Sequence, residues 1–225
     1  MSRLDNWTIV FDLDGTLVET APDLLRALNH TLEHAGIPAV ALPDIREMIG
    51  HGAKAMIARG FELHGSALPP DDLEAHWDRF LAHYRVNIAV DSHPYEGVVE
   101  SLEALKSSGA TLAVCTNKTQ ALAEELLGRL SMSTHFAAIV GADAVPQKKP
   151  HGDHIVQAVL RAGGHPSRAI MIGDSQTDET AAHNAGLPFL FVPFGYEATP
   201  AEQINAAAVV SHYSKLHDLV VAAAL

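Results

Sequence analysis

The sequence predicts an α/β fold, in which a doubly wound parallel sheet carries a small helical domain inserted after its first strand. Three observations lead to this prediction. Short apolar, β-branched runs recur along the chain, helical segments separate them, and the gap between the first two runs is too long for one crossover. Strands that alternate with helices build a parallel sheet with right-handed crossovers.

The apolar runs are the predicted strands. The first, at residues 7–11, is short, mostly apolar and β-branched, and it leads into Asp-Leu-Asp-Gly, which is typical of a buried parallel strand that ends in a loop. Similar runs lie at 111–115, 137–140, 169–172 and 189–192. The segments between them predict helices at 98–107, 119–130, 153–162 and 178–185.

The long gap predicts a separate helical domain. Thr20 is a candidate N-cap, and leucines follow it at helical spacing. Further helical patterns lie at 44–49, 53–63 and 71–88, without a strand pattern between them. We therefore expect an α/β core domain of residues 1–16 and 94–225, and a helical domain of residues 17–93.

Composition narrows the possible partners. The 225 residues carry a net charge of −12, which argues against nucleic acid, because a phosphate backbone needs a basic face. A single cysteine cannot form an internal disulfide, and no run approaches the roughly 18 apolar residues of a membrane span. We expect a cytoplasmic protein that binds neither nucleic acid nor membrane.

Carboxylates directly follow two of the predicted strands. Asp12 and Asp14 come at the end of the first strand, and Asp174 follows the strand at 169–172. Ligands of an open parallel sheet bind beyond the carboxyl ends of its strands. Carboxylates that converge there repel one another, and Mg²⁺, which prefers a few hard oxygen ligands, would relieve the repulsion. We therefore expect Asp12, Asp14 and Asp174 to form a magnesium site, with an ordinary Asp/Gly turn as the alternative for the first pair.

Two further clusters offer groups suited to an anion. Thr116 and Asn117 follow the strand at 111–115, where a hydroxyl and backbone N–H groups could bind a phosphate oxygen. Alternatively, one of the two caps the next helix. Lys149 offers a compact positive charge for a phosphoryl group, and Pro150 restricts the backbone after it. The alternative for this cluster is a solvated basic loop.

Some residues with reactive side chains are expected to have only structural roles. Cys115 lies inside a predicted strand and is expected to be a packed residue. His151 and His154 could share a helix face, but the third ligand that a zinc site needs is not evident.

Taken in order, the clusters resemble the four motifs of the haloacid dehalogenase superfamily in its phosphatase branch. The matching segments are Asp12-Leu13-Asp14-Gly15-Thr16, Thr116-Asn117, Lys149-Pro150 and Gly173-Asp174-Ser175-Gln176-Thr177-Asp178. The inserted helical domain resembles the family's cap. Residues 17–24, 49–53 and 194–196 resemble the phosphoglycolate phosphatase group. Glu19-Thr20 and Gly152 depart from that group, which usually has Asp-Ser and a proline at these places.

The resemblance implies a Mg²⁺-dependent phosphohydrolase that acts on a small phosphate ester. Asp12 would attack phosphorus and form an aspartyl-phosphate, while Asp14 would protonate the leaving oxygen and later activate water. The residues implied to bind the phosphoryl group are Thr116, Asn117 and Lys149. Ser175 and Asp178 would support the site, and Asp178 is expected to orient Lys149 or a metal-bound water.

The implied substrate is 2-phosphoglycolate, with His51 and Gly52 of the cap as candidate contacts. A phosphatase of a sugar phosphate, a nucleoside monophosphate or pyrophosphate is the alternative. Asp14 argues against a dehalogenase, and Thr16 argues against a phosphomutase, which usually has Val or Ile there. A catalytically silent binding module would keep the fold without hydrolysing any phosphate ester.

Overall fold

The computed structural model describes residues 3–196 and 200–224. Its internal contacts divide the chain into two compact units. One unit joins Met1–Glu19 to Pro94–Leu225, and the other is Thr20–His93. The first division therefore falls after Glu19, a few residues beyond the position expected from the sequence.

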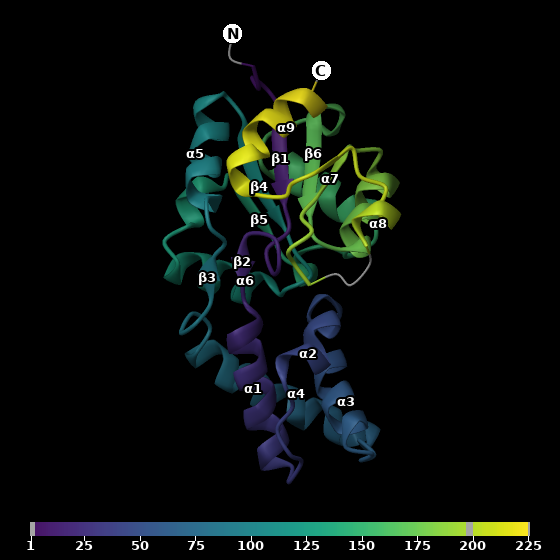
Figure 1. The fold of residues 1–225 in the computed structure, drawn as a ribbon. Helices are drawn as coiled ribbons and strands as arrows, with labels where there is room; N and C mark the ends of the chain where they lie inside the picture. The colour runs from purple at the N-terminus through teal and green to yellow at the C-terminus, as the bar shows by residue number, and fades with distance from the viewer. Residues whose placement is uncertain (1–2, 197–199, 225) are drawn as a thin grey trace. The chain divides into compact units, whose positions relative to one another are not determined.

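Parallel strands form the central sheet of the first unit. Their order is β5-β4-β1-β6-β7-β8 in a 6-stranded sheet, and every pairing is parallel. The strands are β1 Thr8–Phe11, β4 Thr111–Cys115, β5 Ala138–Val140, β6 Ala169–Gly173, β7 Phe189–Phe191 and β8 Ala208–Val209. Figure 1 shows β1 in purple beside β6 in green, so segments far apart in the sequence are neighbours in the middle of the sheet.

Helices pack on this sheet and complete the doubly wound fold that the sequence predicts. They are α5 Val98–Ser107, α6 Gln120–Arg129, α7 Gly152–Arg161, α8 Gln176–Ala185 and α9 Leu216–Ala223. α7 contacts β1, β4 and β5, and α8 contacts β6 and β7. Val10 and Met171 belong to the apolar core beneath these two helices. Their neighbours Ile9 and Ile170 point to the opposite face, because side chains alternate along a strand. α5 contacts both β4 and α9.

Helices build the second unit. They are α1 Ala21–His34, α2 Leu42–Ile45, α3 Ala53–Leu63 and α4 Leu73–Val86. α1 contacts α3 and α4 through buried apolar side chains that include Leu28 and Leu32. A Cβ at Gly60 of α3 would lie 2.9 Å from the Leu32 side chain, so this glycine allows α1 and α3 to approach closely. Within the described ranges, no helix combines the length and apolar character needed to cross a bilayer.

Several short elements differ from the sequence prediction. Residues predicted as a helix at 44–49 divide between α2 and the 3₁₀ helix Arg46–His51. Two strands, β2 Val18–Glu19 and β3 His93–Pro94, pair with each other where no strand was predicted. Each is only 2 residues long, which is too short to show the alternation of apolar and polar residues by which a strand is predicted. Thr20 does precede α1, but its side chain makes no capping hydrogen bond.

Candidate active site

The predicted site residues come together at the carboxyl ends of three adjacent strands. Asp12 follows β1, Thr116 follows β4 and Asp174 follows β6. β1 lies between β4 and β6 in the sheet, so the residues that end these strands meet at one edge. The backbone N–H of Asp12 donates to the carbonyl of Ile172 at 2.9 Å, which fixes Asp12 against the end of β6.

A buried acidic group lies at this edge. Asp12, Asp174 and Asp178 each offer a carboxylate oxygen, and these oxygens all lie within 4.8 Å of one another. Burial raises the pKa of Asp12 to about 7, against the lowering effect of Lys149. Burial and then the charges of Asp178 and Asp12 raise the pKa of Asp174 well above its usual range. Such a group of hard oxygen donors fits a divalent cation, whose charge would relieve the repulsion.

Asp174 is held from both sides. Thr16 Oγ1 donates to its Oδ1 at 3.0 Å, and the backbone N–H of Tyr196 donates to its Oδ2 at 2.7 Å. A Cβ at Gly15 would lie 2.4 Å from Asp174 Oδ2, and a Cβ at Gly195 would lie 2.3 Å from Asp174 Cβ. Glycine at both places therefore leaves the space that this carboxylate occupies.

Lys149 connects two members of the acidic group. Its Nζ lies 2.8 Å from Asp12 Oδ1 and 2.6 Å from Asp178 Oδ1. Burial alone would lower the pKa of Lys149, but the charges of Asp12 and Asp178 outweigh it and raise that pKa above its usual range. A contact with Lys149 is one of the two roles that the sequence suggested for Asp178.

The backbone of Lys149 is held as well. His154, which is fully buried, accepts the Lys149 N–H on Nδ1 at 3.1 Å. Its Nε2 lies 3.2 Å from the carbonyl oxygen of Val140 and donates to it. Asn117 Nδ2 donates to the Lys149 carbonyl at 3.1 Å, so this predicted phosphate ligand contacts the lysine backbone. Burial and the charge of Lys149 lower the pKa of His154 to about 4, which keeps the ring neutral.

Ser175 and Asp178 form a capping box at the start of α8. Ser175 Oγ lies 2.7 Å from Asp178 Oδ2, and the Ser175 N–H donates to the same oxygen at 3.2 Å. Asp178 lies in the first turn of the helix, as predicted. The box orients one oxygen of Asp178 and leaves the other for Lys149.

Asp14 has a different cationic partner. Lys118 Nζ lies 2.9 Å from Asp14 Oδ1, and the Asp14 carboxylate is not a member of the acidic group. The backbone N–H of Lys118 also donates to Thr116 Oγ1 at 3.1 Å. No function of Lys118 was predicted from the sequence, although this lysine directly follows Thr116-Asn117.

Cys115, Gly52 and His51 were also singled out from the sequence. Cys115 is buried, and burial raises the pKa of its thiol well above the usual range, consistent with a packed strand residue. Gly52 precedes α3 with a φ of 96°. The side chain of His51 lies outside the part of the chain that the structure describes.

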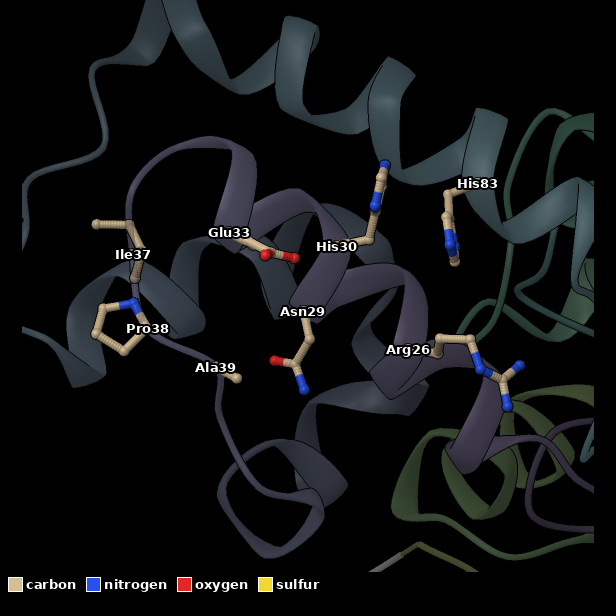
Figure 2. Close-up of a pocket in the computed structure, with 8 residues that line it drawn as sticks. All are labelled: Arg26, Asn29, His30, Glu33, Ile37, Pro38, Ala39 and His83. Carbon is tan, nitrogen blue, oxygen red and sulfur yellow. The ribbon is translucent and has the colours of Figure 1, made fainter.

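A hollow in the second unit carries none of the predicted site residues. Figure 2 shows it between α1, the loop after α1 and α4. The rings of His30 and His83 stack there with centroids 4.2 Å apart. Arg26 at its edge pairs with Asp23 and Asp91. This hollow has no nucleophile beside a base, so the chemistry is assigned to the strand ends of the first unit.

Comparison with known proteins gives the family. Residues 9–192 match the family described as haloacid dehalogenase-like hydrolase. A phosphoglycolate phosphatase of Caulobacter vibrioides is 46% identical over 210 residues, covering 93% of this chain and 89% of that protein. One from Agrobacterium fabrum is 44% identical over 207 residues, covering 92% and 89%. The crystal structure of a predicted phosphoglycolate phosphatase from Haemophilus somnus is 29% identical with a TM-score of 0.89, covering 97% and 99% of the two chains. The family match spans most of the chain and agrees with these relatives, so the chain belongs to the haloacid dehalogenase-like hydrolases.

Proposed function

We propose that this protein is a Mg²⁺-dependent phosphatase of small phosphate monoesters, with 2-phosphoglycolate as its preferred substrate. One observation carries the proposal. Asp12 lies at a strand end inside a buried acidic group and beside Lys149, which places a nucleophile, a cation site and a positive charge together. The relatives named phosphoglycolate phosphatase support the substrate.

Asp12, Asp174 and Asp178 are proposed to hold the metal. Their carboxylate oxygens are the hard donors that Mg²⁺ prefers. Bound Mg²⁺ would supply positive charge to the phosphoryl oxygens. Asp14 was also predicted as a ligand, but its contact with Lys118 favours a proton-transfer role instead.

Four residues of the chain are proposed to carry out the separate steps of the reaction. Asp12 attacks phosphorus, the bond to the leaving oxygen breaks, and an aspartyl-phosphate forms. Asp14 gives a proton to the leaving oxygen and then takes one from the water that hydrolyses the intermediate. Thr116 donates its hydroxyl hydrogen to a phosphoryl oxygen, and Lys149 offsets charge on the transferring group.

A panel of phosphate esters tests the function. We expect kcat/KM for 2-phosphoglycolate to exceed the values for sugar phosphates, nucleoside monophosphates and pyrophosphate by at least about tenfold, which is about 1.4 kcal/mol of transition-state discrimination. A tenfold preference for one of the other compounds would show that the proposed substrate is wrong, but it would not contradict the proposed mechanism. Absence of hydrolysis of every ester in the presence of Mg²⁺ would overturn the phosphatase itself.

His51 and Gly52 are proposed to contact the substrate outside its phosphoryl group. The carboxylate of 2-phosphoglycolate needs a donor, and the net charge of −12 makes a local one more necessary. His51→Ala should therefore raise KM for 2-phosphoglycolate more than KM for p-nitrophenyl phosphate, which has no carboxylate. An equal rise in KM for both esters would show that His51 does not select the substrate.

A further inference from the structure

Each aspartate of the first motif has its own lysine. Lys149 lies 2.8 Å from Asp12, and Lys118 lies 2.9 Å from Asp14. The Lys118 side chain is only 6% exposed, and the Asp14 side chain is 16% exposed. A lysine is seldom buried to this extent unless an opposite charge compensates it. The Lys118–Asp14 pair is therefore part of the interior of the site.

The contact holds one oxygen of Asp14 in place. Lys118 Nζ donates to Asp14 Oδ1, which restricts rotation of the carboxylate and sets the direction of Oδ2. The acidic group forms from Asp12, Asp174 and Asp178, and Asp14 is not one of its members. A group that exchanges a proton with the leaving oxygen has to lie within hydrogen-bond reach of it.

Lys118 also affects Thr116. Its backbone N–H donates to Thr116 Oγ1 at 3.1 Å. Because this oxygen accepts a hydrogen bond there, the hydroxyl hydrogen points to another acceptor. One residue between β4 and α6 thus orients both Asp14 and Thr116.

We propose that Lys118 is the positioning residue for Asp14: its ammonium group keeps the Asp14 carboxyl out of the metal-binding group and directs it to the leaving oxygen. The proposal rests on the proposed function, because it needs Asp14 to be the acid and base. Its consequence is specific. Loss of the ammonium group should harm esters that need a protonated leaving group more than esters that do not.

The central variant is Lys118→Met, in which the side chain stays long and unbranched but loses its charge. For an alkyl phosphate such as 2-phosphoglycolate, kcat should fall on the order of 100-fold, the scale of a general acid's contribution. For p-nitrophenyl phosphate, whose leaving group needs little protonation, the loss should be several-fold at most. Lys118→Arg, which retains the positive charge, should recover part of the alkyl phosphate activity. Lys215→Met, at an exposed lysine, is the matched control.

A double-mutant cycle separates positioning from a general structural effect. In an Asp14→Asn background, Lys118→Met should change the alkyl phosphate rate by less than about threefold, because its partner is already disabled. Equal losses for the alkyl and aryl esters, or a full additional loss in the Asp14→Asn background, would overturn the proposal. If the wild-type protein hydrolyses no phosphate ester, the proposed function fails before Lys118 is tested, so the two failures are distinguishable.

Discussion

His154 Nδ1 accepts the backbone N–H of Lys149 at 3.1 Å, while its Nε2 donates to the Val140 carbonyl 3.2 Å away. One buried imidazole therefore joins the end of β5 to the lysine that contacts Asp12. Only one tautomer of the neutral ring, with the hydrogen on Nε2, can make both hydrogen bonds.

His154→Leu should destabilise the protein and weaken the placement of Lys149. The substitution leaves the buried N–H of Lys149 without its partner, at a cost of about 1–3 kcal/mol, while the Val140 carbonyl keeps the hydrogen bond from the Thr116 N–H. Urea unfolding should show a loss of that order in the unfolding free energy. His183→Leu, at an exposed histidine of α8, should change it by no more than about 0.5 kcal/mol. A loss no larger than that of the control would contradict the role given to His154.

The same histidine should make the protein sensitive to acid. The pKa of His154 is about 4 in the folded protein, below its ordinary value of 6.5. Between these values the unfolded chain binds the proton and the folded protein does not, so this group's contribution to stability is lost as pH falls from about 6.5 to about 4. The difference in unfolding free energy between wild type and His154→Leu should shrink across that window. A difference that stays constant with pH would count against this explanation.

Asp12 should make magnesium binding depend on pH. The pKa of Asp12 is raised from 3.8 to about 7. In the metal-free protein its contribution to stability is present at acid pH and is lost as pH rises through about 7. Mg²⁺ binds the ionised form, so it should raise Tm more at pH 8 than at pH 6.

Thermal unfolding in MgCl₂ and in EDTA at both pH values measures this effect. Asp12→Asn has no proton to lose at this position, so most of the difference between the two pH values should disappear. A Mg²⁺-dependent shift in Tm that is equal at pH 6 and pH 8 in the wild type would show that Asp12 is not coupled to the metal.

Substitutions of Asp12 and of Asp14 should have different effects on esters with different leaving groups. Asp12→Asn removes the proposed nucleophile, so no burst of p-nitrophenol should appear with p-nitrophenyl phosphate. Asp14→Asn removes the proposed proton donor, which this leaving group hardly needs, so the burst should remain while turnover of alkyl phosphates falls about 10²–10⁴-fold. Rapid-mixing measurements of the first turnover distinguish the variants. A burst of the same size in both would mean that the two functions are assigned wrongly.

The strand ends could be predicted from the sequence because two independent signals coincide there. Apolar runs such as 169–172 are short and lie between helical segments, which favours a buried strand, and Asp174 follows after Gly173. Parallel strands end at one edge of their sheet, so Asp12, Thr116 and Asp174 were expected to meet without any knowledge of strand order. β8 was missed because its 2 residues carry too little pattern.

The partners within the site could not be predicted in the same way. Which lysine contacts Asp12 and which contacts Asp14 depends on β4 and β6 being the two neighbours of β1 and on the directions of long side chains. Asp178 joins the acidic group while it forms a capping box with Ser175, and although the Ser-x-x-Asp spacing is the pattern of such a box, it does not say that the other carboxylate oxygen meets Lys149. From the sequence, His154 was predicted only to lie on a helix face. Its hydrogen-bond partners are the backbone N–H of Lys149 and the backbone carbonyl of Val140, and a sequence pattern does not indicate contacts with backbone groups.

Gly195 is expected to control the position of Asp174. Its φ lies outside the left-handed region, so the backbone itself would accept alanine. The obstacle is steric, because the added Cβ would lie 2.3 Å from Asp174 Cβ and 2.5 Å from its Cγ. The carboxylate has to move or the loop carrying Tyr196 has to shift, and either change breaks the 2.7 Å hydrogen bond from the Tyr196 N–H to Asp174.

Gly195→Ala should therefore raise the Mg²⁺ concentration for half-maximal activity by about 10–100-fold, the usual effect of disturbing the support of a metal ligand. Overpacking should also lower the unfolding free energy by about 1–3 kcal/mol. Gly128→Ala is the matched control, because the nearest atom to its added Cβ, Ser133 Oγ, lies 3.9 Å away. Magnesium titrations of activity, with circular dichroism to verify folding, measure both effects. If Gly195→Ala loses stability but keeps the wild-type magnesium dependence, Asp174 does not hold the metal, and the assignment of the acidic group has to be revised.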